Sequence, residues 1–344
     1  MMIETILTVI LISTTNLTIT EPVDGQSYWI GDSLTVRAIV ENDNEKADSV
    51  HYSLNGEPVL QIPRLNTDWY TYMQNDLHHG YSESPAPTDN TILWTAPVTG
   101  DYHEFPTPVI VDGIVYYPSN CGTDSLYALD AATGELIWKY RTGMTDDAVT
   151  VKDGYLYTAS DSLWCLDALT GERIWATGDA DWEGSTPAVV DGKVYGGQNA
   201  YVPKWQWMSY VYCFDAATGT KIWADTLPGK MLCCMTVWND MVLIPLYAPN
   251  QETPLYALDA NTGLIMWENT DGFEGYWDSS PVVVDSVIYI SGIDGKTRAI
   301  DAITGITNWE VDISPGIAIT ATPAYHDSRL YFGDQDNSYH CLDA

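Results

Sequence analysis

Basic residues are scarce in this sequence. Its 344 residues include 14 Lys and Arg against 47 Asp and Glu, which gives a formal net charge of −33. Nucleic-acid binding needs cationic side chains that replace counterions on the phosphate backbone, and charge-driven docking on anionic lipid needs the same residues. The composition therefore argues against both. It suits a soluble secreted surface, or one that recruits divalent cations or a basic partner.

Long hydrophobic runs are also missing. The apolar run from Ile6 to Ile12 is too short to cross a bilayer, so we predict no transmembrane segment. Glu4 stands where an export signal usually carries basic residues, and no small-residue cleavage site follows the run. We interpret residues 1–20 as a weak signal-like segment or a β-strand.

Cysteine is too rare for a disulfide scaffold, with six residues in a chain of this length. Cys165, Cys213 and Cys341 occupy a position that Ala fills in other copies of the repeat described below, so we expect small core residues there. The sequence shows no Ser-His-Asp order, glycine-rich phosphate loop or zinc-ligand spacing. We therefore predict no catalytic residue.

The sequence does contain a motif that returns about every forty residues and ends in Trp. Successive tryptophans of the motif lie 37, 48, 44 and 42 residues apart, and Trp94 lies 44 residues before Trp138. Self-similarity at such a period indicates a repeat architecture. The copies are LDAATGELIW (129–138), LDALTGERIW (166–175), FDAATGTKIW (214–223), LDANTGLIMW (258–267) and IDAITGITNW (300–309), with a truncated LDA at 342–344.

Each repeat contains four short runs that favour β-strands. Between Ser185 and Trp223 these runs are TPAVVDG, KVYGG, YVYCFDA and TKIW, and their Asp-Gly and Thr-Gly steps supply the positive φ of tight turns. Four-stranded units at this period are typical of propeller blades. We predict an all-β propeller with one docking tryptophan between neighbouring blades. These tryptophans are Trp94, Trp138, Trp175, Trp223, Trp267 and Trp309.

The pattern A-x-D-x-x-T-G-x-x-x-W resembles the tryptophan-docking repeat of β-propellers of the pyrroloquinoline quinone (PQQ)-like family. That family includes quinoprotein alcohol dehydrogenases and the scaffold lipoprotein of outer-membrane barrel assembly. The resemblance covers roughly residues 68–344. It implies the propeller fold, but the same blades serve enzymes and scaffolds, so it leaves the function open.

Three segments are predicted from these patterns. Residues 21–66 resemble the first half of a bacterial Ig-like surface module, which predicts a partial Ig-like β-domain. Residues 67–90 resemble the lead-in segment of PQQ-like propellers, and residues 91–344 contain the propeller. His78 and His79 in the lead-in would point to opposite faces of a strand, which favours a structural role over a metal site.

The two ends of the propeller have complementary defects. NTILW, which ends at Trp94, matches an outermost strand with no earlier strands of its own, whereas the last repeat stops before its tryptophan strand. We therefore predict six blades, with the ring closed by the strand around Trp94. The alternative is that the sequence is a fragment of a longer propeller.

Acidic residues precede several innermost strands, at positions that share one face of a propeller. Clustered carboxylates suit Ca²⁺, so these residues are candidates for a binding rim, although on so acidic a chain they also fit a solvated surface. Asp334 and Asp336 are further candidate Ca²⁺ ligands. The rim candidates are Glu104, Asp146, Asp147, Glu183 and Asp278.

Two other features lie on the same face. Tyr201, Trp205 and Trp207 belong to an insertion at residues 198–209, where they would either bind a partner or pack over the blade edge. Cys233 and Cys234 lie where an innermost strand begins. The resemblance implies a vicinal disulfide beside a quinone at that point, whereas a buried pair of thiols is the simpler expectation.

These patterns lead to two functional hypotheses. The first is a non-catalytic scaffold without a cofactor that binds a protein or a glycan and is extracellular, at the cell surface or periplasmic. The second is a PQQ-dependent alcohol dehydrogenase or its remnant, which would use PQQ and Ca²⁺. The catalytic Asp and the quinone and calcium ligands of that branch have no match in this sequence. The sequence does not indicate the oligomeric state.

Overall fold

The computed structural model of the chain is built from β-strands, as predicted. It describes strands within residues 2–63, and residues 68–82, 90–96, 107–119, 124–143, 148–177, 186–202, 206–252 and 254–344. These described parts contain no helix that is long and apolar enough to cross a membrane. The chain divides into two compact units, Met1–Thr67 with Glu83–Ala86, and Asp68–Ser82 with Pro87–Ala344.

The described strands of the first unit form three small antiparallel sheets. β1 pairs with β4, β3 pairs with β5, and β6 lies between β2 and β7. The predicted Ig-like domain overlaps these strands, and its fold type stays a prediction. The strands are β1 (Met2–Glu4), β2 (Leu7–Ile10), β3 (Asn16–Glu21), β4 (Ser27–Trp29), β5 (Arg37–Glu41), β6 (Ser49–Leu54) and β7 (Glu57–Pro63).

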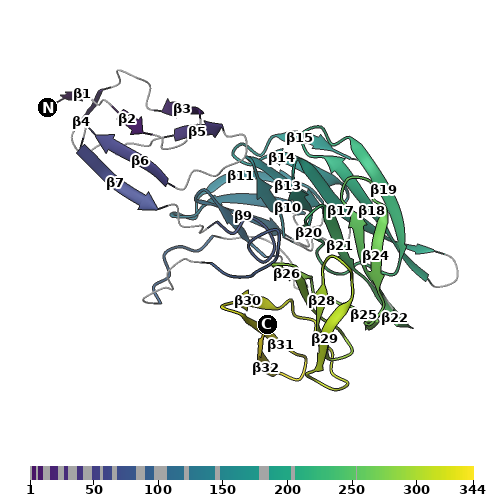
Figure 1. Cartoon of the computed structure of the whole chain (residues 1–344). Helices are drawn as coiled ribbons and strands as arrows, with labels where there is room; N and C mark the ends of the chain where they lie inside the picture. Colours follow the sequence, from purple (N-terminus) through teal and green to yellow (C-terminus); the bar gives the residue numbers. More distant parts are fainter. Residues whose placement is uncertain are drawn as a thin grey trace. The chain divides into compact units, whose positions relative to one another are not determined.

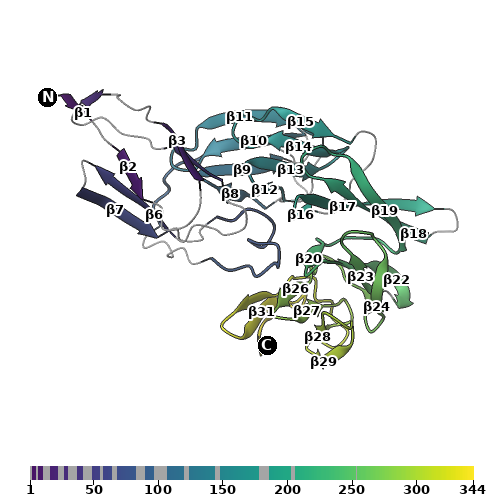
Figure 2. The same ribbon diagram turned by 45° about the horizontal axis from the view of Figure 1, so that its top comes forward.

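The second unit is a β-propeller of antiparallel sheets that follow one another in chain order (Figures 1 and 2). Among the described strands of this unit, five sheets have four strands, the last has three, and β22 and β25 form a separate two-stranded sheet. The sheets, called blades 1 to 6 below, are β8–β11 (Val109–Val111, Ile114–Ser119, Ser125–Asp130, Leu136–Arg141), β12–β15 (Thr150–Lys152, Tyr155–Ala159, Leu163–Asp167, Arg173–Ala176), β16–β19 (Ala188–Val190, Lys193–Val202, Gln206–Asp215, Lys221–Pro228), β20, β21, β23 and β24 (Thr236–Trp238, Met241–Pro245, Leu255–Asp259, Ile265–Asn269), β26–β29 (Val282–Val284, Val287–Ser291, Lys296–Asp301, Thr307–Asp312) and β30–β32 (Ala324–His326, Arg329–Gly333, Tyr339–Asp343).

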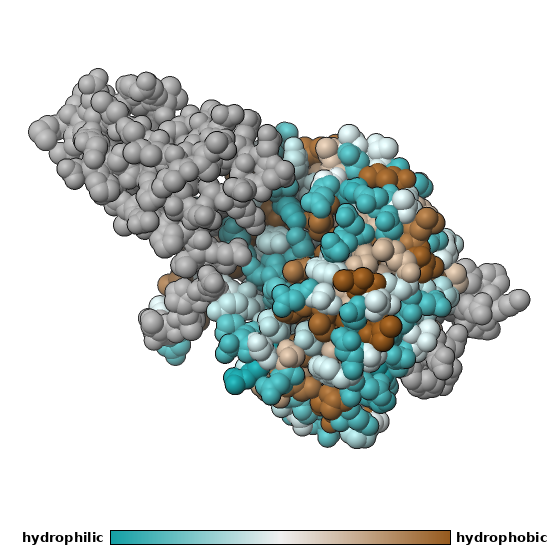
Figure 3. Space-filling model, viewed as in Figure 1, coloured by the Kyte–Doolittle hydropathy of each residue, from teal (hydrophilic) through white to brown (hydrophobic). Residues whose placement is uncertain are grey.

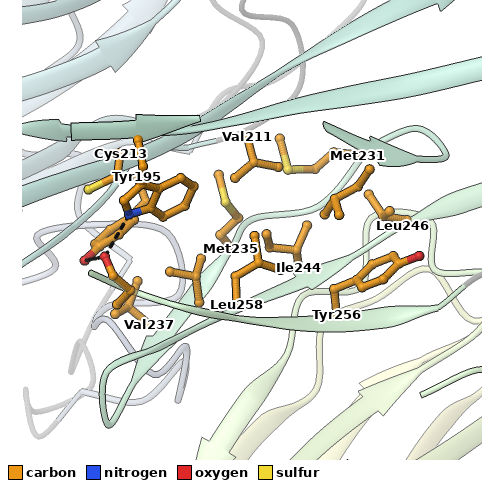
Figure 4. Close-up of a cluster of buried hydrophobic side chains, with 14 residues drawn as sticks. Tyr195, Val211, Cys213, Met231, Met235, Val237, Ile244, Leu246, Tyr256 and Leu258 are labelled. Carbon is orange, nitrogen blue, oxygen red and sulfur yellow. Dashed lines mark hydrogen bonds between the residues drawn. The ribbon is translucent and has the colours of Figure 1, made fainter. Parts of the chain in front are cut away.

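Buried apolar clusters join each blade to the next. In the cluster between blades 3 and 4, Tyr195 and Cys213 pack toward Met235, Ile244 and Leu258 (Figure 4). Burying one such side chain contributes about 1.5–3 kcal/mol, so these clusters hold the sheets face to face. On the surface, apolar side chains form separate groups among hydrophilic ones (Figure 3).

The tryptophan of each motif lies against the following blade. Trp138 Nε1 donates a hydrogen bond to Ala168 O at 2.9 Å, and its ring covers Gly171. A methyl group at Gly171 would lie 2.7 Å from that ring, and the φ of 73° there also favours glycine. The contact recurs with Trp94 on Ala131 and Gly134, Trp175 on Ala216 and Gly219, Trp223 on Ala260 and Gly263, and Trp267 on Ala302 and Gly305, while Trp309 packs into the cluster between blades 5 and 6.

The Asp and Thr of the motif form its turn. The Asp130 carboxylate accepts hydrogen bonds from the backbone N–H of Thr133 at 2.8 Å, from the Thr133 hydroxyl at 2.9 Å and from the Ala132 N–H at 3.0 Å. The bonds from Thr133 lower the pKa of the Asp130 carboxyl. The polar residues of the motif are thus engaged in building the fold. The same turn is formed at Asp215, Asp259 and Asp301.

Residues 68–82, here called the hub segment, lie along the innermost strands, which face the inner side of the arc in Figure 2. The hub segment forms backbone and side-chain hydrogen bonds with these strands on that side. Its contacts reach blades 1, 2, 4, 5 and 6. They are Trp69 with Ile110, Tyr70 O with Val151 N (2.8 Å), His78 Nδ1 with Thr236 Oγ1 (3.0 Å), Leu77 O with Val283 N (3.2 Å) and His79 O with Tyr325 N (2.9 Å).

The last blade differs from the prediction. Among the described strands, β32 pairs only with β31, and residues 90–96 around Trp94 form no strand. The predicted pairing of the strand around Trp94 with β32 is therefore not formed. Trp94 docks on blade 1 through its side chain, and that contact needs no backbone hydrogen bonds to blade 6. Cys341, expected in the core, is exposed, as is Tyr339 on the same face of β32.

The docking contact predicts a difference between two glycines of the same conformation. Gly171→Ala brings a methyl group against the Trp138 ring, whereas Gly154, with a φ of 80°, has no heavy atom within 4 Å of that position. Both changes strain the backbone, but only Gly171→Ala must displace a ring. We expect Gly171→Ala to lower the free energy of unfolding by about 2 kcal/mol more than Gly154→Ala, measured by urea denaturation. Equal losses would contradict the docking account.

Candidate binding site on the loop face

The structure describes some of the predicted site residues and not others. Glu104, Asp146, Asp147, Glu183 and Trp205 lie outside the described residues, as does the side chain of Tyr201. The predicted acidic rim therefore stays a prediction. Trp207, Cys233, Cys234 and Asp278 are described, and they lie on neighbouring segments of blades 3 and 4 and of the connection to blade 5.

The insertion of blade 3 is a long β-hairpin. β17 and β18 remain paired from Lys193 opposite Asp215 to Val202 opposite Gln206. The insertion thus extends two strands of the blade and is not an irregular loop. Trp207 lies near the tip of this hairpin, in register with the backbone of Tyr201, and is half-buried.

A second segment crosses beside Trp207. Gly229 N donates to Trp207 O at 2.9 Å, and the next residue, Lys230, exchanges two backbone hydrogen bonds with Tyr247, at 2.7 and 2.8 Å. The Lys230 ammonium lies 4.8 Å from the centre of the Trp207 ring. This is cation–π distance, so Lys230 places its charge over an aromatic face.

A third segment brings another tryptophan to the same place. β22 (Tyr247–Glu252) pairs with β25 (Phe273–Gly275), with Tyr247 opposite Gly275. After β25, Tyr276 is fully buried, so Trp277 points outward and is 45% exposed. Its ring centre lies 5.3 Å from that of Tyr247, with the two planes tilted by 43°.

Asp278 completes the group. Its φ of 60° turns the chain after Trp277, and the residue is exposed. Partial burial of the carboxyl raises the pKa of Asp278, and the nearby Lys230 ammonium offsets part of that rise. An aromatic pair, an ammonium and a carboxylate are thus gathered together. We call Trp207, Lys230, Tyr247, Trp277 and Asp278 the aromatic platform.

The aromatic platform rests on the buried core. Met231 and Leu246 follow Lys230 and precede Tyr247 in the chain, and both are fully buried in the cluster of Figure 4. Asn199 holds the backbone of Met231 through bonds of 2.9 Å to its N–H and 2.8 Å to its carbonyl. The Ser209 hydroxyl donates to Gly229 O at 3.0 Å. These contacts fix the segments that carry the exposed side chains.

Cys233 and Cys234 are buried free thiols that lie beneath the same region. Cys233 Sγ donates to Tyr276 O at 3.4 Å, and Cys234 N donates to the Ser280 hydroxyl at 2.9 Å. Burial raises the pKa of the Cys233 thiol well above its ordinary value. The pair therefore supports the turn that carries Trp277.

The described polar groups of the hub segment and of the innermost strands beside it are hydrogen-bonded within the chain. His78 is buried with its Nδ1 3.2 Å from Pro281 O, the Thr236 hydroxyl donates to Pro281 O at 2.7 Å, and Thr71 and Thr150 join their hydroxyls at 2.7 Å. These groups are used within the chain. Among the residues that the structure describes, no three His, Cys, Asp or Glu side chains are grouped to hold a metal ion.

Asp334, a candidate Ca²⁺ ligand, is engaged in a turn. Its carboxylate accepts hydrogen bonds from the Ser314 hydroxyl, from His340 Nε2 at 2.9 Å and from the N–H groups of Asp336 and Ser338 at 3.0 Å each. Ser314 and His340 lower the pKa of this carboxyl far below its usual range. The structure thus gives Asp334 a role in the hairpin of blade 6.

The fold and the motif define a PQQ-like β-propeller. The family model described as outer membrane protein assembly factor BamB matches residues 84–204 and 207–344. These residues make up most of the chain, which therefore belongs to this family.

Similar proteins differ in what their names say they do. A polyvinylalcohol dehydrogenase of Pseudomonas sp. is 30% identical over 117 residues, which are 31% of this chain and 18% of that protein. BamB of Moraxella catarrhalis has a TM-score of 0.53 at 17% identity and covers 88% of this chain and 78% of its own. Quinohemoprotein alcohol dehydrogenase of Comamonas testosteroni has a TM-score of 0.61 at 19% identity, over 72% of this chain and 49% of that one. The chain thus spans less than half of the length of these two dehydrogenases.

Sequence reasoning missed three members of the aromatic platform, Lys230, Tyr247 and Trp277. They belong to no repeated motif, and they meet only because β22 pairs with β25 and Lys230 with Tyr247. One signal was present, since Trp277 is a tryptophan outside the repeated motif, just before an innermost strand, and Trp182 holds the comparable position in the sequence of blade 3.

The buried His78 of the hub segment predicts that the free energy of unfolding depends on pH. Burial lowers the pKa of His78 from 6.5 to about 4. The His78 imidazole therefore takes up a proton more readily in the unfolded chain than in the folded one. As the pH falls through 6.5, this difference lowers the free energy of unfolding. From about pH 7 to about pH 5 the loss amounts to about 2 kcal/mol.

We expect His78→Gln to reduce this decline by about that amount, measured as the difference between the urea unfolding free energies at the two pH values. His326→Gln, which removes an exposed histidine that stacks on Tyr81, serves as the control and should keep the wild-type decline. A decline that is identical in all three proteins would show that His78 is not the titrating group.

Proposed function

We propose that this chain is a non-catalytic scaffold that binds a protein or glycan partner through the aromatic platform. The observation that carries this proposal is Trp277, a half-exposed aromatic ring beside Tyr247, on a backbone held by hydrogen bonds to the buried core. Large aromatic side chains on rigid supports are typical anchors of binding sites, because they bury much area at little entropic cost.

The hub supports a scaffold role over a dehydrogenase role. The resemblance to quinoprotein dehydrogenases implies a quinone beside the pair Cys233 and Cys234. In this chain both thiols are buried, and the polar groups of His78 and Thr236 bond to the backbone of Pro281. The names of the dehydrogenase relatives favour the rival function, but the match covers only part of those proteins.

The family description supports a location outside the cytoplasm. It names an assembly factor of the outer membrane, and an acidic, aromatic-rich propeller fits an extracellular, cell-surface or periplasmic protein. Fractionation of the source cells checks this part of the proposal. Recovery of the chain in the cytoplasmic fraction would contradict it.

The scaffold function predicts that the chain holds no quinone. After incubation of the purified chain with PQQ and Ca²⁺ and removal of free ligand by gel filtration, we expect no quinone absorbance with the protein and no dye-linked oxidation of primary alcohols. A quinoprotein alcohol dehydrogenase treated in parallel provides the positive control. Retained quinone together with dye reduction would refute the scaffold function.

A further inference from the structure

We propose that the aromatic platform binds the face of a pyranose ring of a neutral glycan. This inference rests on the proposed function and names the class of partner. It is carried by the half-exposed Trp277 and the neighbouring Tyr247 ring, with Lys230 paired to Tyr247 and Asp278 next to Trp277 in the chain.

The geometry of the two rings suits an amphipathic ligand. One face of a pyranose presents C–H bonds, whereas its edge carries hydroxyl groups. The Trp277 and Tyr247 planes are tilted by 43° with their centres 5.3 Å apart, so together they form an angled aromatic surface instead of a closed stack. An apolar sugar face laid on the exposed indole buries area without leaving a polar group unpaired.

The polar groups beside the rings match the edge of a sugar. The Asp278 carboxylate accepts hydrogen bonds and the Lys230 ammonium donates them, which are the two functions that recognise hydroxyl groups. Lys230 pairs with Tyr247, and the Tyr247 ring lies beside Trp277, the residue that precedes Asp278. A site of this kind, aromatic with a few polar groups at its margin, is typical of small-ligand recognition.

Charge distinguishes between classes of glycan. The chain carries a formal net charge of −33, and Asp278 adds a carboxylate at the platform itself. Lys230 supplies one ammonium there, and it lies over the Trp207 ring. Repulsion from so acidic a protein disfavours uronic-acid or sulfated chains, so the glycan that fits is a neutral one.

The backbone beneath the site is held in place before any ligand arrives. Trp207, Lys230 and Tyr247 are joined by hydrogen bonds of 2.7 to 2.9 Å that run through Gly229, and Tyr276 N donates to Leu246 O at 2.9 Å just before Trp277. Rigid support reduces the ordering that binding would otherwise require.

The test measures binding of the purified full chain to an array of neutral glucan, galactan and mannan oligosaccharides and to uronic-acid and sulfated oligosaccharides. We expect saturable binding to at least one neutral oligosaccharide and weaker binding to the acidic ones. Trp277→Ala should weaken that binding about tenfold or more, and Trp277→Phe should restore part of it. Tyr339→Ala, which removes a ring that is 91% exposed on blade 6, is the matched control and should bind like the wild type.

Two results would overturn the inference. One is no binding to any neutral oligosaccharide, and the other is binding that Trp277→Ala leaves unchanged while circular dichroism shows both proteins folded. Neither result would contradict the proposed scaffold function, because the partner could still be a protein. Retention of PQQ with dye-linked alcohol oxidation would instead refute the scaffold function itself, so the two failures are distinguishable.

Discussion

The propeller depends on one contact, the tryptophan of each motif packed on the glycine of the next. Every docking indole except that of Trp309 donates a hydrogen bond to a carbonyl of the following blade and covers a glycine at which a methyl group would clash, as Trp138 does with Ala168 and Gly171. The contact fixes the distance and the angle between neighbouring sheets. Because it uses only the invariant part of each repeat, the hairpins and connections on the loop face are free to differ from blade to blade.

That freedom separates the structural part of the molecule from the part we assign to function. The hub segment satisfies the innermost strands, with the buried His78 set between Thr236 and Pro281. The aromatic platform lies where the blades differ most, on the extended hairpin of blade 3 and the paired β22 and β25. Its support comes from the core cluster between blades 3 and 4, so the most exposed ring of the platform, that of Trp277, is held by fully buried residues.

The repeated features could be predicted from sequence, and the features that depend on one blade could not. The roles of Asp130, Thr133 and Gly134 follow from local turn chemistry that recurs along the chain, so the motif alone indicates the fold. Burial depends on the neighbouring blade, which is why Cys341 is exposed while Cys165 in the same position of blade 2 is buried. The meeting of Tyr247 with Trp277 requires a strand pairing that no repeat announces. The prediction of a closing strand around Trp94 was wrong for a related reason, since a tryptophan side chain can dock on a blade without pairing of its backbone.

The central claim is that partners bind at the aromatic platform while the hub remains structural. Amide hydrogen exchange of the full chain, with and without a saturating neutral oligosaccharide, tests it most directly. The account predicts slower exchange at residues 207–210, 229–231, 246–248 and 275–279, with no change in the hub segment at residues 68–82. Protection of the hub segment and of residues 233–236, with none at the aromatic platform, would contradict it.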